Sequence, residues 1–298
     1  MMGLLRPFHL PGDPDLGWNA QDARAALKKR ERTARKRAQT ARPSPYRLFD
    51  MHCHLDRMAN ADDVAAEAAE RGLALFGVTV TPAETKAASE RFASAPNVRI
   101  GVGLHPWWLA DAGSQADSAD RAALMAAQSR FVGEIGLDFG PKNLSTSDAQ
   151  IQAFELIVRA CAERPMEGRV LSIHAVRSAQ AALDILERFD MTHQAACIFH
   201  WFSGSSDELA RARALGCLFS VSEHMLASKR GREYARQIPL DRLLLETDAP
   251  PELDAPYRAG QLETSLEHTL DQLSEIRSTA RDDLATAIAA TSSRLLDL

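Results

Sequence analysis

Two histidines one residue apart raise the first question of chemistry in this chain. His52 and His54 lie in the run FDMHCHLD, residues 49–56, among apolar neighbours. Alternate residues of a β-strand share a face, so both imidazoles can point one way while Met51 and Cys53 point the other, toward covering helices. Neutral imidazole is a common ligand of transition metals. Two such side chains need further ligands, which other parts of the chain must supply.

Further residues of metal-binding types stand at the ends of other short apolar runs. They are His105, Glu134, Asp138, His174, His200, Glu246 and Asp248. A single histidine at a strand end is more often a packed side chain than a ligand, but its recurrence over several runs favours a metal centre. Imidazole nitrogen with carboxylate oxygen suits Zn²⁺, Mn²⁺ or Fe²⁺ better than Ca²⁺. A set of four histidines and two carboxylates exceeds the needs of one tetrahedral ion, so we expect two ions about 3.5–4 Å apart with a bridging carboxylate.

The apolar runs alternate with longer segments of helical periodicity, and together these elements must position the polar residues. The expected strands are 46–55, 73–80, 98–106, 130–139, 169–176, 195–202, 216–222 and 242–250. The expected helices are 60–71, 83–94, 118–128, 147–163, 178–189, 206–214, 227–237, 262–276 and 280–296. Strand runs without strict alternation are typical of parallel strands that helices cover on both faces.

Eight strand–helix units predict a single (β/α)₈ TIM barrel over residues 46–298. An open doubly wound sheet is the alternative, although no GxGxxG or GxxxxGK(S/T) motif follows the first strand. In a barrel, the carboxyl ends of all strands meet at one mouth, where active sites form. The barrel would therefore gather the polar strand-end residues in one basin.

The composition of the 298-residue chain, with 45% hydrophobic and 25% charged residues, is that of an ordinary globular protein. No apolar stretch approaches the roughly 20 residues that a membrane span needs, and the N-terminus lacks the apolar core of a secretory signal. The four cysteines have no CxxC spacing, so we expect them to be reduced and buried. These features predict a cytoplasmic protein without membrane contact, and they leave its oligomeric state open.

Charge is distributed unevenly along the chain. Residues 1–45 carry ten Lys and Arg and four acidic residues, a net charge of +6, so the remainder of a chain with net charge −5 carries −11. The basic segment KKRERTARKR, residues 28–37, could attract a nucleic acid or an acidic protein surface. A solvated helix or a frayed tail is the alternative. We expect residues 1–45 to form a basic extension outside the barrel, which can be partly disordered.

Six motifs resemble those of the TatD-type deoxyribonucleases, within the amidohydrolase superfamily. In order they are DMHCHLD (50–56), GLHP (103–106), GEIGLDF (133–139), SIHAV (172–176), HWFSGS (200–205) and ETDAP (246–250). The resemblance covers about 46 to 250 well and the final helices loosely. It implies that His52, His54 and Asp248 hold one divalent ion, His174 and His200 a second, and that Glu134 bridges them. Many other amidohydrolases bridge with a carboxylated lysine, which the fourth strand run lacks.

The chain departs from the family pattern at three places. Trp201 replaces the cysteine common after the sixth-strand histidine, and we expect it to face the helices as a packing change. In HAVR, Arg177 stands one residue beyond the family's arginine, a phosphate contact. After ETDAP, the chain offers Arg258 where many members have Arg-Asn-x-Pro.

The resemblance implies a metal-dependent hydrolase, a 3′–5′ exodeoxyribonuclease that cleaves phosphodiesters with water activated by two divalent ions (Mg, Mn or Zn). Asp248 and Glu134 are the expected catalytic residues, with Asp248 as proton acceptor. Further contacts to substrate or to the ligands are expected from His105, Asp56, Asp138, Arg177, Ser203 and Glu246. Trp107 and Trp108 could stack on a base, and packing in the core or closing the rim are the alternatives.

DNA or a nucleotide is the expected substrate. Because the acidic barrel repels a long polyanion, a short 3′ end or a small nucleotide is favoured. Two other functions are compatible with the sequence. The same metal centre could hydrolyse an ester or amide, on an aminoacyl-tRNA or a small metabolite, or the chain could be a non-catalytic nucleic-acid-binding adaptor.

Overall fold

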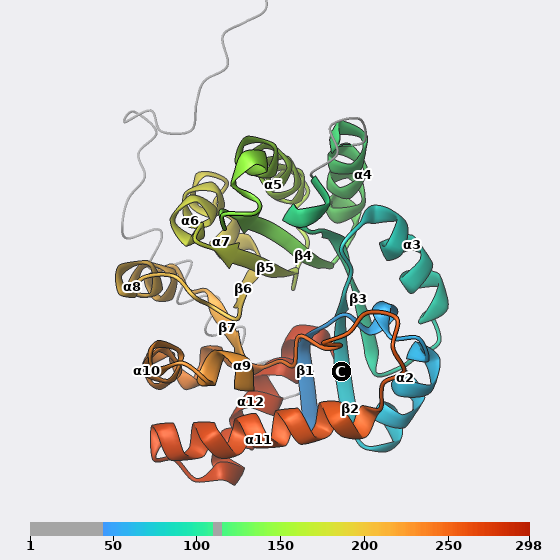
Figure 1. Ribbon diagram of the computed structural model, residues 1–298, viewed down its shortest axis with the longest axis vertical. Coiled ribbons are helices and arrows are strands. Elements are labelled where there is room, and N and C mark those ends of the chain that lie inside the picture. The colour runs from blue at the N-terminus through green and yellow to red at the C-terminus, as the bar shows by residue number, and fades with distance from the viewer. Residues whose placement is uncertain (1–43, 110–114) are drawn as a thin grey trace, which may run out of the picture. The chain divides into compact units, whose positions relative to one another are not determined.

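Eight parallel strands form a nearly closed barrel in the computed structural model, which describes residues 44–109 and 115–298 (Figure 1). The strands pair in sequence order from β1 to β8. They are β1 (Leu48–Cys53), β2 (Leu73–Val78), β3 (Val98–Leu104), β4 (Phe131–Asp138), β5 (Val170–Val176), β6 (Ala196–His200), β7 (Leu218–Val221) and β8 (Leu243–Leu245). The predicted TIM barrel is confirmed, and the open sheet is excluded.

Helices surround the strands, as Figure 1 shows. The longer ones are α2 (Ala61–Glu70), α3 (Pro82–Arg91), α4 (Gln115–Gln128), α5 (Ser147–Glu163), α6 (Ala179–Arg188), α8 (Ser206–Ala214), α10 (Lys229–Gln237), α11 (Ala259–Arg277) and α12 (Arg281–Leu296). The described residues also form two single helical turns, α7 (Met191–Gln194) and α9 (Glu223–Leu226). Their 3₁₀ turns are η1 (Leu55–Arg57), η2 (Pro106–Leu109), η3 (Leu144–Thr146) and η4 (Leu240–Arg242). No helix among the described residues is both long and apolar enough to cross a bilayer.

Local sequence explains where several helices begin. The hydroxyl of Thr81 accepts from the backbone N–H of Glu84 at 3.2 Å, and Pro82 occupies the first turn of α3. Ser205 and Glu208 form a reciprocal capping box at the start of α8. Such caps satisfy backbone donors that the first helical turn leaves unpaired.

Two apolar clusters fill the molecule. The larger one lies between strands and helices, and the smaller one joins side chains of β1, β2, β5, β6, β7 and β8. Since several of these strands are not neighbours in the sheet, their side chains meet across the barrel interior. Leu296 of α12 belongs to the same interior cluster.

One sequence expectation about β1 is wrong. Met51 belongs to the interior cluster, whereas Cys53 packs in the outer one, so the two do not share the helix-facing side. The reason is an irregularity in the pairing of β1 with β2 between Asp50 and Cys53. An extra residue there breaks the strict alternation of faces, as β-bulges do.

All four cysteines are free and buried, as expected. The basic segment 28–37 lies outside the described residues. The division of the chain into residues 1–45 and 46–298 stays a prediction.

Candidate metal centre

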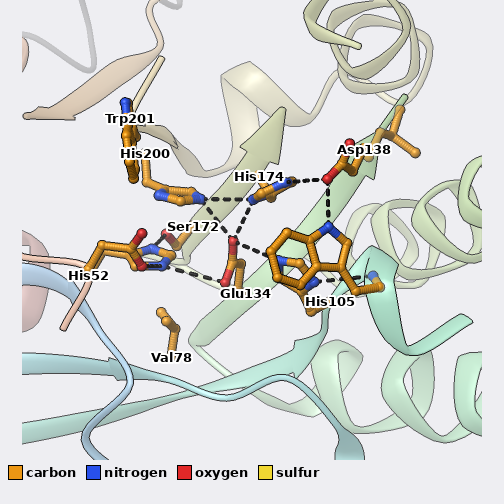
Figure 2. Close-up of polar contacts among 12 residues, drawn as sticks. His52, Val78, His105, Glu134, Asp138, Ser172, His174, His200 and Trp201 are labelled. Atoms are coloured by element: carbon orange, nitrogen blue, oxygen red, sulfur yellow. Dashed lines mark hydrogen bonds and ion pairs between the residues drawn. The ribbon is translucent and has the colours of Figure 1, made fainter. Parts of the chain in front are cut away.

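The strand-end residues meet at the carboxyl mouth of the barrel, as the sequence predicted. His52 lies on β1 and His54 directly follows it, while Asp248 follows β8. Glu134 comes from β4, His174 from β5 and His200 from β6. Figure 2 shows the imidazoles of His52, His105, His174 and His200 turned toward the Glu134 carboxylate.

Glu134 presents a different oxygen to each of two groups of side chains. Its Oε2 lies 3.5 Å from Nε2 of His52 and 3.4 Å from Nε2 of His54. Its Oε1 lies 2.8 Å from Nδ1 of His174 and 2.8 Å from Nε2 of His200. Oδ1 of Asp248 completes the first group, at 3.6 Å from Nε2 of His52 and 3.5 Å from that of His54. A carboxylate placed in this way can bridge two cations.

Unpaired buried atoms test whether these residues fit metal ions. Nε2 of His52 and Oε2 of Glu134 are buried and have no hydrogen-bond partner. A buried polar atom without a partner costs about 1–3 kcal/mol, so native proteins rarely leave two of them face to face. A cation between them would satisfy both. The ligand atoms of His52, His54 and Asp248 all lie within 4.8 Å of one another, as do those of His105, Glu134 and His174. The donor set therefore fits divalent metal ions.

Electrostatics keep His52, Glu134 and Asp248 in the forms that bind metal. Burial, with a smaller contribution from the neighbouring His200, lowers the pKa of His52 to about 4. Burial alone would raise the pKa of Glu134, but His105, His200 and His52 outweigh it and hold that pKa well below the ordinary value. Burial likewise opposes the ionisation of Asp248, but the hydrogen bond with His54 and the charges of neighbouring histidines lower its pKa. Carboxylates and neutral imidazole are the ligating species.

Like His54 and unlike His52, His174 has a pKa above the ordinary value of an imidazole. Burial lowers its pKa, but the hydrogen bonds with Asp138 and Glu134 outweigh burial and raise the pKa to about 9. In the metal-free protein at neutral pH, this imidazole is therefore protonated. A metal ion must displace that proton when it binds.

The Nδ1 atoms of His52 and His54, which point away from the Glu134 carboxylate, contact other residues. Nδ1 of His52 lies 2.7 Å from Oγ of Ser172, and Nδ1 of His54 lies 3.2 Å from the carbonyl oxygen of Val78. These contacts leave Nε2 of both rings for the metal. Sequence reasoning missed Ser172, although its place two residues before His174 on the same strand face was a usable signal.

Two buried carboxylates support the second group. Asp138 lies 3.6 Å from Nε2 of His174 and accepts hydrogen bonds from Nε1 of Trp107 at 2.5 Å and from Nδ2 of Asn143 at 2.9 Å. Glu246 lies 4.0 Å from Nδ1 of His200 and accepts from the backbone N–H of Trp201 at 2.9 Å. It also accepts from the hydroxyl of Ser220. Both carboxylates lie behind a histidine, at 3.6 Å from Nε2 of His174 and 4.0 Å from Nδ1 of His200.

A further pair of residues joins β1 to the segment after β8. The carboxylate of Asp50 accepts from the N–H of His52 at 3.2 Å, from the N–H of Thr247 at 3.0 Å and from its hydroxyl at 2.6 Å. We call this pair the Asp50–Thr247 clasp. Beside it, the N–H of Asp248 donates to the carbonyl of His52 at 3.0 Å. The clasp fixes the spacing between ligands of one group, and sequence reasoning missed both of its members.

A cavity of about 510 Å³ opens over this centre. Its lining includes His54, Arg57, His105, Trp107, Trp108, Glu134, His174, His200, Trp201, Ser203 and Asp248. Of the remaining predicted contacts, Asp56 lies half-buried in η1 and Arg177 is exposed after β5, and neither is among the described lining residues. His105 lies directly beside the candidate ligands, because its Nε2 is 3.3 Å from Oε1 of Glu134.

The expectation for Trp201 is wrong. It lines the cavity and is 40% exposed, so its indole is not buried in the layer of helices around the strands. The residue has a left-handed backbone conformation with φ of 39°, which ends the alternation of faces after β6. The neighbouring aromatic residues Trp107 and Trp108 are also exposed at the rim, at 53% and 40%.

Comparison with known proteins agrees with this geometry. Residues 49–297 match the family model described as TatD related DNase. The 3′–5′ ssDNA/RNA exonuclease TatD of Pantoea vagans is 29% identical over 254 residues, which cover 81% of this chain and 96% of that protein. The protein of the same name from Dickeya dadantii is 35% identical over 192 residues, 62% of this chain and 69% of that one.

Solved structures show the same fold. The crystal structure of a TatD homologue from Escherichia coli aligns with a TM-score of 0.70 at 23% identity, covering 85% of this chain and 98% of that one. A hydrolase of the TatD family from Entamoeba histolytica aligns with a TM-score of 0.68 at 16% identity, covering 84% and 98%. With a family match over almost the whole barrel and a donor set suited to divalent metals at its mouth, the chain belongs to the TatD-related DNase family of metal-dependent hydrolases.

Proposed function

We propose that this protein is a 3′–5′ exonuclease that hydrolyses the last phosphodiester of single-stranded DNA or RNA. The observation that carries the proposal is Glu134, whose two oxygens face two separate groups of ligand atoms. Relatives named as 3′–5′ ssDNA/RNA exonucleases supply the polarity and the substrate class.

The ligands divide into two sites. His52, His54 and Asp248 would hold one divalent ion and His174 and His200 a second, with Glu134 available to both groups. Two ions of the Mg, Mn or Zn type, when bound there, would supply an activated water and neutralise charge on the phosphoryl group. Magnesium, manganese and zinc remain alternatives, since mixed nitrogen and oxygen ligands accept each of them with different affinity.

Asp248 is the residue that takes the proton of the attacking water. Its carboxylate is ionised, lines the cavity and keeps 23% of its side chain exposed, so substrate and water can reach it. It later returns the proton to the leaving oxygen. His105, whose pKa burial lowers to about 4, stays neutral and contacts the phosphoryl group as a hydrogen-bonding group without charge.

The cavity suits the end of a single strand. Its volume of about 510 Å³ lies within the range of about 300–1,000 Å³ typical of sites for small ligands. Its exposed tryptophans offer flat apolar faces, which a paired base in a duplex cannot reach. The seven Lys and Arg of residues 28–37 supply the positive charge that the acidic barrel lacks, and we assign them a role in attracting the strand.

Degradation of a single-stranded oligonucleotide labelled at its 5′ end tests the proposal, in Mg²⁺ and in Mn²⁺. The wild-type protein should shorten the strand stepwise from the 3′ end. Glu134→Ala should lose at least about 100-fold in rate, because each ligand group loses the Glu134 oxygen that faces it. Glu90→Ala, which removes an exposed carboxylate of α3, is the matched control and should keep full activity.

Two results would contradict the proposal. The first is equal degradation by wild type and Glu134→Ala. The second is a metal-loaded wild-type protein that leaves DNA and RNA intact but hydrolyses an aminoacyl ester. That result would favour the alternative function, hydrolysis of an ester or amide.

A further inference from the structure

Trp201 occupies an unusual place at the mouth of the barrel. It directly follows the ligand His200, and its indole lines the cavity over the metal centre. Figure 2 shows it beside His200. A contact other than the indole holds the backbone of Trp201, because its N–H donates to the buried carboxylate of Glu246 at 2.9 Å. The indole is therefore an exposed aromatic surface on a fixed backbone.

His224 of α9 covers part of this indole. The two rings stack with centroids 5.4 Å apart and an angle of 22° between their planes. The imidazole supports the indole on one side, and the indole remains 40% exposed. A flat aromatic face beside a reactive centre is a surface on which a nucleobase can stack.

The Trp201–His224 stack stands between two cavities. Trp201 lines the cavity over the metal centre, whereas His224 lines a second cavity of about 370 Å³. Asp248 lines both, so the two cavities lie on either side of the same strand-end segment. A chain of nucleotides that has one phosphodiester at the metals could therefore continue past the stack into the second cavity.

The second cavity is polar but offers little fixed positive charge. Its lining includes Tyr257, Gln261 and Thr264, which carry neutral donors and acceptors. The carboxylate of Glu223 is occupied, since it accepts from Oγ of Ser265 at 2.8 Å and lies 3.0 Å from Nδ1 of His268. Such a lining suits the neutral, hydrogen-bonding edge of a base better than a phosphate.

Cationic contacts are equally sparse in the first cavity. Among the described residues that line either cavity, Arg57 is the one arginine or lysine. Its guanidinium already lies 2.5 Å from the Glu84 carboxylate and 4.7 Å from the centre of the Trp108 ring. Beyond the metal ligands, aromatic stacking is thus the main interaction that these cavities offer to a nucleic acid.

We propose that the Trp201–His224 stack is a platform for the nucleobase next to the scissile phosphodiester, and that the second cavity receives the following nucleotide of the strand. The inference rests on the proposed exonuclease activity and deepens it. The preferred substrate is then a strand with at least two unpaired bases at its end, held by stacking more than by ion pairs. A strand whose terminal residues lack bases loses this interaction.

The test compares an intact single-stranded oligonucleotide with one that has abasic residues at its last two positions. For the wild-type protein, the abasic strand should show a KM about 5- to 150-fold higher, the equivalent of the roughly 1–3 kcal/mol that stacking of one base contributes. In Trp201→Ala, the ratio of the two KM values should fall close to one. Trp201→Phe retains an aromatic face and should keep most of the discrimination, and His224→Ala should lower it partly.

Two controls separate the platform from general damage. Leu124→Ala, which truncates an apolar side chain 63% exposed on α4, should keep the wild-type ratio. The Mn²⁺ affinity of Trp201→Ala should equal that of wild type if His200 stays in place. A wild-type protein that degrades neither strand would refute the exonuclease proposal. A wild-type protein that degrades both with the same KM, or a Trp201→Ala variant with the wild-type ratio, would refute the platform alone.

Discussion

The Asp50–Thr247 clasp gives a sharp test of how the barrel positions its metal ligands. Asp50 is fully buried and accepts three hydrogen bonds, two of them from backbone N–H groups next to or within the ligand segments. Asp50→Ala removes the acceptor for all three donors. Asp50→Asn is the matched control, because its oxygen can still accept from both N–H groups while its amide donates to the Thr247 hydroxyl.

The magnitude follows from the hydrogen bonds that Asp50→Ala removes. Each buried donor left without an acceptor costs about 1–3 kcal/mol, so three of them should lower the free energy of unfolding by about 3 kcal/mol or more. The segments that carry His52 and Asp248 also lose the acceptor that ties them together. Removal of such supporting groups typically weakens metal affinity by about 10- to 100-fold, or about 1.4–2.7 kcal/mol.

Two measurements check this expectation. Urea denaturation of the metal-free protein gives the loss of stability, and titration of Mn²⁺ by calorimetry gives the change in affinity. Asp50→Asn should lie close to wild type in both. If Asp50→Ala binds Mn²⁺ with wild-type affinity while its unfolding free energy falls, the clasp stabilises the fold but does not position the ligands.

Two further predictions concern the fold and the basic segment. The fully buried Arg169 donates to the backbone carbonyls of Ala126, Ala127, Ser129, Cys161 and Arg164. Arg169→Leu should therefore lower the free energy of unfolding by about 3–5 kcal/mol. The control Arg188→Leu breaks one exposed ion pair with Glu155 and should lower it by less than about 1 kcal/mol. Equal urea midpoints for the two variants would contradict this assignment. Replacement of the seven Lys and Arg of residues 28–37 by Gln should weaken the binding of long single-stranded DNA. The slope of log affinity against log salt concentration should become shallower by about 0.7 for each phosphate that the segment neutralises in the wild-type protein. An unchanged slope would show that this segment does not contact the strand.

The sequence alone determined the architecture and which candidate ligands gather at the mouth of the barrel. Apolar runs alternating with helical stripes specify parallel strands and covering helices, and eight such units close a barrel. Once the barrel is given, its geometry brings strand-end residues together, which is why His52, Glu134 and Asp248 could be placed at one mouth although they are far apart in the chain. This inference needs only the direction of each strand and the position of each residue on it.

Tertiary structure decided what depends on departures from regular strands. The irregularity in β1 puts Met51 and Cys53 on opposite faces, and the left-handed backbone at Trp201 turns the indole to the cavity. Neither departure has a local sequence signal, because alternation predicts faces only while the strand stays regular. Arg177, also with a positive φ of 55°, is exposed after β5 and is not among the described residues that line the cavity.

Tertiary structure also decided which residues support the ligands. Asp50 bonds to Thr247 across 197 positions, and Ser172 meets His52 across 120. Such pairs depend on strand register and on where the first and last strands meet. Residue types at strand ends thus revealed the chemistry of this protein, whereas the exact hydrogen bonds that hold its ligands became visible only when distant strands were brought side by side.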